Sequence, residues 1–458
     1  PAFAGTWYIE DGDITISAGK DGNDVTQNET TTKNDTDTVI TNRHKDTASS
    51  NTVTIEAKDE DDKVEVTLKD VNIDASRGSE AAVSVTGKGD TNIELDGDNE
   101  LKSGAGHAGL EHNKTDTSGE LTIQDNNKDG GSLKATGGQF GAGIGGAGVN
   151  DAQVKITGGK ITATGGEFGA GIGGGFKGSG DVTITGGEIT ANGGSYGAGI
   201  GGGIFGLSNV TIEGNTKVNA TGGAGGAAIG GGAGAENNSD NNGNQITIKS
   251  NENGSPTINA VGGGTDEGEE IVIGGAGIGA GCESDADADI TLEGKVTITA
   301  TAGKDNVAIG ANGIEQEFSG LAEGSSITRY GSEGNDITLP TDPVPAVPSS
   351  SGGGSAGASV QESVFPGLIV TDKDGQRISY TSIRGNNVLS LRVGRFTASL
   401  HASLSTLRQL RAEGIDTITF QTILCSTTLS VDELLAMGGE DAEAVLTHRF
   451  TASSLTVG

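Results

Sequence analysis

Aromatic residues, cysteine and long apolar runs are scarce in this sequence, and each scarcity excludes a class of protein. Aromatics make up 3% and hydrophobic residues 32% of the 458 residues, which is too little to fill the core of a large compact globule. The two cysteines cannot build the disulfide framework of a small secreted scaffold. No apolar run approaches the roughly 18 residues that span a bilayer, so we expect no membrane insertion.

Positive charge is also scarce. The chain has 29 Lys and Arg against 62 Asp and Glu, which gives a net charge of −33. A protein that binds nucleic acid needs a basic stripe to neutralise phosphates, so we expect no nucleic-acid partner. The same balance disfavours anionic membranes and bare polyuronates. It is typical of a soluble exported protein and is compatible with bound divalent cations.

Glycine, by contrast, is abundant at 82 residues, and it recurs at a fixed period. The units GGQFGAGIGG, GGEFGAGIGGG, GGSYGAGIGGG and GGAGGAAIGGG follow one another between residues 135 and 232. Gly138, Gly166 and Gly194 are 28 residues apart, and Gly223 follows after 29. A constant period of this length predicts a solenoid, in which each repeat stacks on the last.

Between the glycines, apolar and polar residues alternate as they do in β-strands. In DVTITGGEITANGG, Val182 and Ile184 would point to one side and Thr183 to the other. Three short strands and three Gly corners make one coil, and stacked coils align small aliphatic residues in columns that fill the bore. The expected columns are Val154, Val182, Val210; Ile156, Ile184, Ile212; Ile161, Ile189, Val218; Ala163, Ala191, Ala220; and Ile144, Ile172, Ile200, Ile229.

The pattern predicts an all-β fold, a right-handed parallel β-helix with about nine or ten coils spaced about 4.8 Å apart, plus a small C-terminal α+β domain. We expect residues 1–50 to form an N-terminal cap region and residues 51–339 the β-helix. The Pro, Ser and Gly of residues 340–359 predict a linker, and residues 360–458 the α+β domain.

Local signals support two helices and a hairpin in that last domain. Leu404, Leu407 and Leu410 lie at helical spacing before Gly414, which predicts one helix and its C-terminal end. Ser430 and Glu433 form a capping box for a second helix. The segment LIVTDKDGQRISY predicts a hairpin around Lys373-Asp374-Gly375.

The units GG-x-[FY]-GAGIGGG after VTITGG-x-I resemble repeats in secreted surface proteins of gut Firmicutes, usually labelled carbohydrate-binding or adhesin-like β-helix proteins. NIELDGDNELKSGAGHAGLEHN resembles the segment that precedes those repeats, and LRQLRAEGIDTITFQT with LSVDELLAMGG resembles a module that often follows them. The resemblance covers residues 5–335 and 400–450. It implies the architecture and a surface role, and it assigns no catalytic residue.

An aromatic column is the first candidate site. Phe140, Phe168 and Tyr196 share one repeat position and would stack about 4.8 Å apart. On the outside, such a column would suit stacking against sugar rings, since exposed apolar stripes usually mark binding. Inside the bore or at a corner, it would only staple the coils together, and the sequence leaves both readings open. The polar residues beside the column are Gln139, Glu167 and Ser195.

A calcium-binding turn at Asp125, Asn127 and Asp129 is the second candidate. The run DNNKDG matches the opening half of an EF-hand loop, with oxygen ligands at positions 1, 3 and 5 followed by Gly. Thr136 stands where an EF-hand has its bidentate Glu, which excludes a complete EF-hand. The alternative is an ordinary Asp/Asn/Gly turn.

Two further polar clusters have competing interpretations. The run DADAD at residues 285–289 would attract a cation or form a solvated acidic loop. His107 and His112 flank Glu111 and suggest an acid/base or metal cluster, but no other residue pairs with them by spacing. A polysaccharide-cleaving enzyme would need basic residues beside acidic ones in a groove, and the central coils contain few lysines. We therefore expect no enzymatic activity.

The leading prediction is a non-catalytic extracellular β-helix protein that binds glycan, or adheres, at the bacterial surface. The alternative is a structural rod or a self-assembling filament or surface-layer subunit, and a minor alternative is a polysaccharide-active enzyme. Ala2-Phe3-Ala4 has the small-x-small pattern of a signal-peptide cleavage site, which predicts a secreted or cell-surface protein.

Overall fold

The computed structural model of the chain describes residues 4–237, 243–264, 273–343 and 367–458, apart from residues 379, 385–386, 394, 423 and 439–441. The described residues form two compact units, the larger made of those up to residue 343 and the smaller of those from residue 367 onward. Most of the linker predicted at 340–359 lies outside the described residues.

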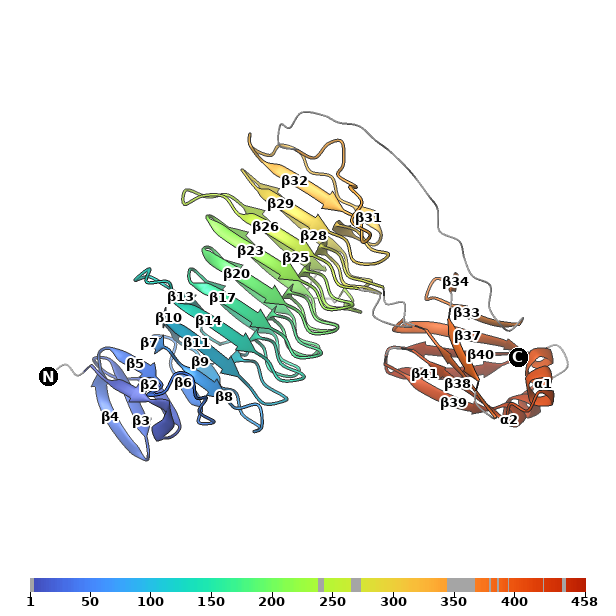
Figure 1. Cartoon of the computed structure of the whole chain (residues 1–458), viewed down its shortest axis with the longest axis horizontal. Helices are drawn as coiled ribbons and strands as arrows, with labels where there is room; N and C mark the ends of the chain where they lie inside the picture. Colours follow the sequence, from blue (N-terminus) through green and yellow to red (C-terminus); the bar gives the residue numbers. More distant parts are fainter. Residues whose placement is uncertain are drawn as a thin grey trace. The chain divides into compact units, whose positions relative to one another are not determined.

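The larger unit is a parallel β-helix, in which successive coils add strands to three long sheets (Figure 1). Sheet 1 contains β1 (Thr6–Tyr8), β5 (Thr38–Thr41), β7 (Lys63–Lys69), β10 (Asp90–Asp96), β13 (Leu121–Gln124), β16 (Ala152–Ile156), β19 (Gly180–Ile184), β22 (Ser208–Glu213), β25 (Asn244–Lys249) and β28 (Ala288–Glu293). Sheet 2 contains β8 (Asn72–Asp74), β11 (Asp98–Lys102), β14 (Ser132–Thr136), β17 (Lys160–Thr164), β20 (Gly187–Asn192), β23 (Thr216–Thr221), β26 (Thr257–Val261), β29 (Thr297–Thr301) and β32 (Ser326–Tyr330).

Sheet 3 has the shortest strands in its middle, where the GAGIGGG segments pair. It runs in the order β4 (Thr30–Asp35), β3 (Asn23–Gln27), β2 (Ile14–Ala18), β6 (Val53–Ala57), β9 (Val83–Gly87), β12 (Leu110–His112), β15 (Ile144–Gly145), β18 (Ile172–Gly173), β21 (Ile200–Gly201), β24 (Ile229–Gly230), β27 (Ile278–Gly279), β30 (Ile309–Ala311) and β31 (Ile314–Glu315). These parallel sheets confirm the predicted fold class and are consistent with a right-handed coil.

The bore is filled by the predicted aliphatic columns. Val154, Val182 and Val210 pair in register across β16, β19 and β22, and each is at most 2% exposed. Ile172 and Ile200 pair in the same way in sheet 3 and are fully buried. Alternation places the intervening Thr and Asn on the outer wall. The bore is narrow enough for Val, Ile and Ala side chains to fill it.

The N-terminal end combines the first coil with an antiparallel extension. Within the predicted cap region β1 pairs with β5, and β2 of this region pairs with β6 just beyond it, so the described part of the cap region already contributes to sheets 1 and 3. Strands β3 and β4 continue sheet 3 in antiparallel fashion. The short 3₁₀ helix η1 (Ile9–Asp11) follows β1. Buried Asp35 accepts hydrogen bonds from the Gly5 amide at 2.8 Å and the Trp7 indole at 2.7 Å, which fixes the start of the chain.

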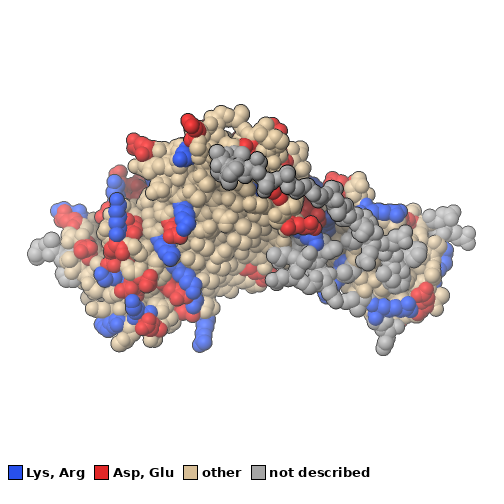
Figure 2. Space-filling model, turned by 45° about the horizontal axis from the view of Figure 1, so that its top comes forward, with Lys and Arg blue, Asp and Glu red and all other residues tan. Residues whose placement is uncertain are grey.

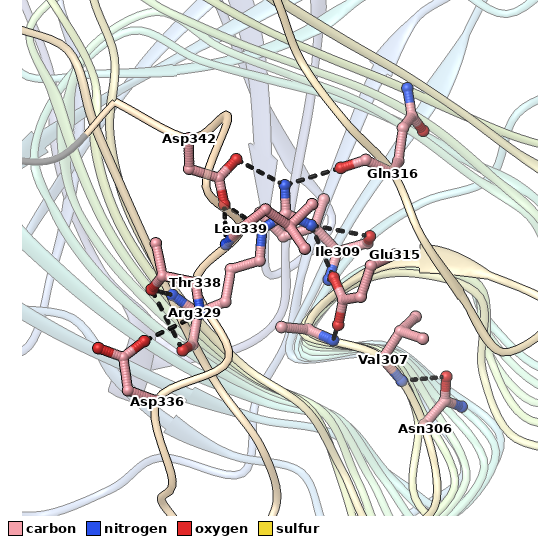
Figure 3. A network of polar contacts seen from close by, with 11 residues as sticks. Asn306, Val307, Ile309, Glu315, Gln316, Arg329, Asp336, Thr338, Leu339 and Asp342 are labelled. Carbon is pink, nitrogen blue, oxygen red and sulfur yellow. Dashed lines mark hydrogen bonds and ion pairs between the residues drawn. The ribbon is translucent and has the colours of Figure 1, made fainter. Parts of the chain in front are cut away.

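The C-terminal end is closed around one buried arginine (Figure 3). Arg329 occupies the inward position that Ala300 holds in the preceding coil, and its side chain is fully buried. Its guanidinium donates to Asp342 at 2.7 and 2.9 Å and to Glu315 at 2.6 Å. The Ile327 amide donates to the carbonyl of Pro343. Asp342 and Pro343, at the start of the predicted linker, therefore belong to this closure, which is a correction to that boundary.

The smaller unit is an α+β domain with a core of its own, as the sequence predicts. One sheet contains β33 (Leu368–Thr371), β34 (Arg377–Ile378), β37 (Thr397–Ser403), β40 (Glu443–Arg449) and β41 (Ala452–Val457), and the other β35 (Thr381–Arg384), β36 (Val388–Arg392), β38 (Thr417–Gln421) and β39 (Ser426–Ser430). Helices α1 (Leu404–Ala412) and α2 (Val431–Met437) begin at the N-caps Ser403 and Ser430. Among the described residues, no helix is long and apolar enough to cross a membrane.

Candidate functional site

The predicted aromatic column exists, and it lies at the corner that follows sheet 2. Phe140, Phe168 and Tyr196 each come four residues after β14, β17 or β20 ends. The Phe140 and Phe168 ring centroids are 5.4 Å apart with an interplanar angle of 17°, and those of Phe168 and Tyr196 are 5.8 Å apart at 15°. All three rings are half-buried and lie outside the bore. The rings therefore stack along the β-helix axis while still reaching solvent.

Two further aromatic rings, not predicted from the sequence, extend this column into a cluster. Phe176 meets Phe140 and Phe168 edge-on, with centroids 5.7 Å from both. Phe205 meets Phe176 at 6.5 Å. The aromatic cluster is defined as Phe140, Phe168, Phe176, Tyr196 and Phe205. The sequence signal for Phe176 and Phe205 was an aromatic residue after a GIGGG run, as in GIGGGFKG and GIGGGIFG. The two residues do not occupy equivalent positions in the repeat.

Backbone hydrogen bonds bring the two parts of the cluster together. The Phe176 amide donates to the carbonyl of Phe140 at 2.8 Å, and the Ile204 amide donates to that of Phe168 at 2.9 Å. The segments that follow β18 and β21 are thus hydrogen-bonded to the corner of an earlier coil. Because both backbones are fixed, the rings are held in place before any ligand arrives.

The ring geometry is compatible with both interpretations of the column, as a binding surface and as a contact that stabilises the stacked coils. Offset-stacked and edge-to-face pairs at these distances stabilise a structure by about 0.5–1.5 kcal/mol each, so the rings do staple neighbouring coils. Each ring covers part of its neighbour's face, and all three residues of the column remain partly exposed to solvent. Exposed Lys177 places its ammonium 5.3 Å from the Phe176 ring centroid, which is a cation–π contact.

The polar side chains predicted to lie beside the aromatic column are exposed next to it. Gln139, Glu167 and Ser195 are exposed, and the Gln139 amide donates to the Glu167 carboxylate at 2.8 Å. Two outward columns of sheet 2 contain only Thr and Asn through β17, β20 and β23. They are Thr162, Thr190, Asn219 and Thr164, Asn192, Thr221. In the view of Figure 2, charged side chains crowd the N-terminal part of the β-helix and are sparse over its middle.

The predicted calcium turn shows crowded carboxylates. The Asp129 amide donates to Asn127 Oδ1 at 3.4 Å, as in an Asx turn. Loss of hydration and the nearby carboxylates of Asp96 and Asp125 raise the pKa of Asp129. Within the described residues, no group of three His, Cys, Asp or Glu side chains is placed to hold a metal ion. Calcium binding at Asp125, Asn127 and Asp129 stays a prediction.

The acidic run at residues 285–289 lies before and at the start of β28. Asp289 belongs to β28, whereas Asp285 and Asp287 precede that strand, and all three side chains are exposed. Asn312 donates to Asp287 at 3.0 Å, so this carboxylate has a partner within the protein.

The histidine cluster separates into two unrelated contacts. The Nδ1 atom of His107 lies 2.7 Å from Glu111 Oε2, and the amide of Ala108 donates to the same oxygen. His112 is 2% exposed and donates from Nδ1 to the carbonyl of Gln153 at 2.7 Å. Burial lowers the pKa of His112. The two imidazoles therefore do not share a site, which weakens the acid/base or metal interpretation.

Comparison with known proteins supports the repeat architecture. Residues 129–148, 154–176 and 182–204 match a family model described as Beta helix repeat. The matched repeats form middle coils of the parallel β-helix. Four of the five rings of the aromatic cluster lie inside these matched repeats, and Phe205 follows the last by one residue. No curated protein and no solved structure matches the chain.

Proposed function

We propose that this β-helix repeat protein is a non-catalytic extracellular protein that binds a glycan through the aromatic cluster. The observation that carries the proposal is a set of five mutually packed, half-exposed rings on the outer wall of a chain in which aromatics make up only 3% of residues. Aromatic residues placed outside a core usually serve recognition, because burying them elsewhere would stabilise the fold more.

The chemistry of the cluster suits a sugar. A pyranose ring has a face of C–H groups that packs against an aromatic ring and a rim of hydroxyls that need hydrogen bonds. Gln139, Glu167 and Ser195 supply an amide, a carboxylate and a hydroxyl beside the rings, and these groups both donate and accept. The uncharged Thr and Asn columns of sheet 2 offer further hydrogen bonds at each coil, so a glycan chain would lie along the β-helix axis.

A glycan array with the full chain tests this proposal, followed by titration of any glycan that binds. Phe168→Ala removes the central ring, and we expect it to weaken binding by about two- to tenfold, since one aromatic contact contributes about 0.5–1.5 kcal/mol. Phe168→Tyr keeps the ring and should preserve binding. A thermal melt of both variants checks that they fold. An array without any signal, or equal affinity of Phe168→Ala and the parent chain, would contradict the proposal.

A further inference from the structure

A polar pocket lies on sheet 2, in coils that precede the aromatic repeats. Its volume is about 530 Å³, within the range of small-molecule sites. Strands β8, β11 and β14 and the loop that contains Lys45 and Asp46 form its walls. The side chains used in the argument below are Lys45, Asn72, Asp98, Glu100, Ser132 and Lys134.

The register of the strands gathers these groups from three coils. Asn72, Glu100 and Lys134 pair in one column, so their side chains emerge at successive levels of the same face. Asp98 and Ser132 pair in the neighbouring column, and the Ser132 hydroxyl donates to Asp98 at 2.8 Å. Donors and acceptors thus alternate over a surface that is two residues wide and three coils long.

The loop that forms the outer wall is fixed by hydrogen bonds. The side chain of Asn42, 7% exposed, accepts from the Asn72 amide at 2.8 Å and donates to the carbonyls of Asn72 and Thr47. The Asn72 side chain donates to the carbonyl of Lys45 at 2.8 Å. The pocket is therefore formed in the free protein and needs no loop rearrangement.

Charges in the pocket are mixed, and they exclude several ligand classes. Glu100 Oε1 lies 3.1 Å from Lys134 Nζ and 3.2 Å from Lys102 Nζ, and Lys45 Nζ lies 3.8 Å from Asp70 Oδ1. Two lysines and three carboxylates line the pocket, so neither a polyanion nor a metal cation is favoured there. Val71 is the one aliphatic lining residue and is fully buried, which excludes an apolar ligand.

We propose that this pocket binds a short neutral oligosaccharide through its hydroxyl groups. Carboxylates and amide oxygens accept from sugar hydroxyls, and ammonium and amide groups donate to them. The pocket shares no lining residue with the aromatic cluster, so this proposal does not depend on the function proposed for that cluster. Ligand binding also gives a reason for the oppositely charged side chains around the pocket. Exposed ion pairs contribute only about 0–1 kcal/mol to folding, so stability alone gives little reason for them.

Calorimetric titration of the full chain tests the proposal with cellotriose, maltotriose, mannotriose and chitotriose, and with trigalacturonate as the charged comparison. We expect at least one neutral trisaccharide to bind, and Glu100→Gln and Lys134→Met each to weaken that binding tenfold or more. Lys217→Met is the matched control, because Lys217 is as exposed as Lys134 and pairs with Glu188 on the same sheet. It should bind like the parent chain.

The outcomes separate this site from the aromatic cluster. Loss of binding in Glu100→Gln with retention in Phe168→Ala supports the pocket, whatever the glycan array shows. Binding of trigalacturonate alone, no binding of any neutral trisaccharide, or equal affinity of the pocket variants and the parent overturns it. Loss in Phe168→Ala with retention in both pocket variants also overturns it, because the sugar is then bound at the aromatic cluster.

Discussion

Glycine decides, at the scale of single residues, how closely the coils approach at the corner after sheet 2. A Cβ added to Gly194 would lie 1.5 Å from the carbonyl oxygen of Gly166, and one added to Gly166 would lie 1.7 Å from that of Gly138. Real Cβ atoms do not come this close to backbone, so any other residue would force the coils apart. Glycine at this position of each repeat is thus a steric requirement and not a matter of flexibility.

Gly194→Ala should therefore destabilise the β-helix by about 1–3 kcal/mol or more, as overpacking does in a rigid interior. Gly106→Ala is the control, because a Cβ at Gly106 meets no atom within 4 Å. Urea denaturation followed by circular dichroism measures both. Equal midpoints for the two variants would show that the corner can relax, contrary to this account.

A buried histidine makes the stability of the β-helix depend on pH. Burial lowers the pKa of His112 below its ordinary value of 6.5, so the unfolded chain binds a proton more readily than the folded one. The stability that neutral His112 contributes is therefore complete above pH 6.5. It is lost as the pH falls from 6.5 toward the lowered pKa.

We expect the melting temperature to fall between about pH 7.5 and about pH 5.5, and to fall less in His112→Gln than in the parent. His44→Gln changes an exposed histidine and serves as the comparison. Differential scanning calorimetry at both pH values provides the measurement. An identical decrease in the parent and in His112→Gln would remove His112 as the cause.

At the scale of elements, the last coil depends on a buried ion pair. Arg329 and Asp342 both have fully buried side chains, and Glu315 holds the Arg329 guanidinium on its other side while accepting from the Ala308 and Ile309 amides. Strand β31 turns back on β30 and covers its edge. One network thus joins the ends of sheets 2 and 3.

Arg329→Met should destabilise this end by about 3–5 kcal/mol, because it leaves the Asp342 carboxylate buried without its ion-pair partner. The double variant Arg329→Met with Asp342→Leu should recover much of that loss, since it removes both fully buried charges. Hydrogen exchange of the β32 and β30 amides reports the local effect. Unchanged protection in the single variant would mean that water reaches Asp342 without cost.

The sequence predicts the elements well where they repeat and poorly where they do not. The columns through Val182 and Ile172 follow from period and alternation alone. Alternation also places Arg329 in an inward position, but its partners lie 13 and 14 residues away in irregular segments. Phe176 was missed because its repeat position holds Gly148 and Ile204 in the neighbouring coils. The pocket was missed because the loop around Lys45 forms its wall, and no periodicity places that loop.

At the scale of the whole β-helix, antiparallel strands close sheet 3 at both of its described ends. Strand β4 is polar and exposed, and Thr31 and Lys33 face solvent on it. Charged and polar edge strands resist pairing with another copy, as does a strand that folds back on its own edge. These closures argue against end-to-end assembly through sheet 3, which is one route to the filament alternative.

We therefore expect sedimentation velocity to give one species of constant sedimentation coefficient from low to high micromolar concentration. Thr31→Val with Lys33→Val makes the β4 edge apolar and should promote association. Larger species in the parent chain that grow with concentration would favour the filament or surface-layer alternative over the glycan-binding proposal.

The 28-residue spacing has a further implication for how such a chain changes its length. One extra residue is absorbed between Gly194 and Gly223, which are 29 residues apart and keep the same close contact, and copying residues 166–193 as a block would restore each contact one step later. The duplicated block would also carry one more ring of the Phe168 kind, with both closures untouched. Growth by whole turns therefore offers a direct way to vary how many contact points one molecule presents, in evolution or by design.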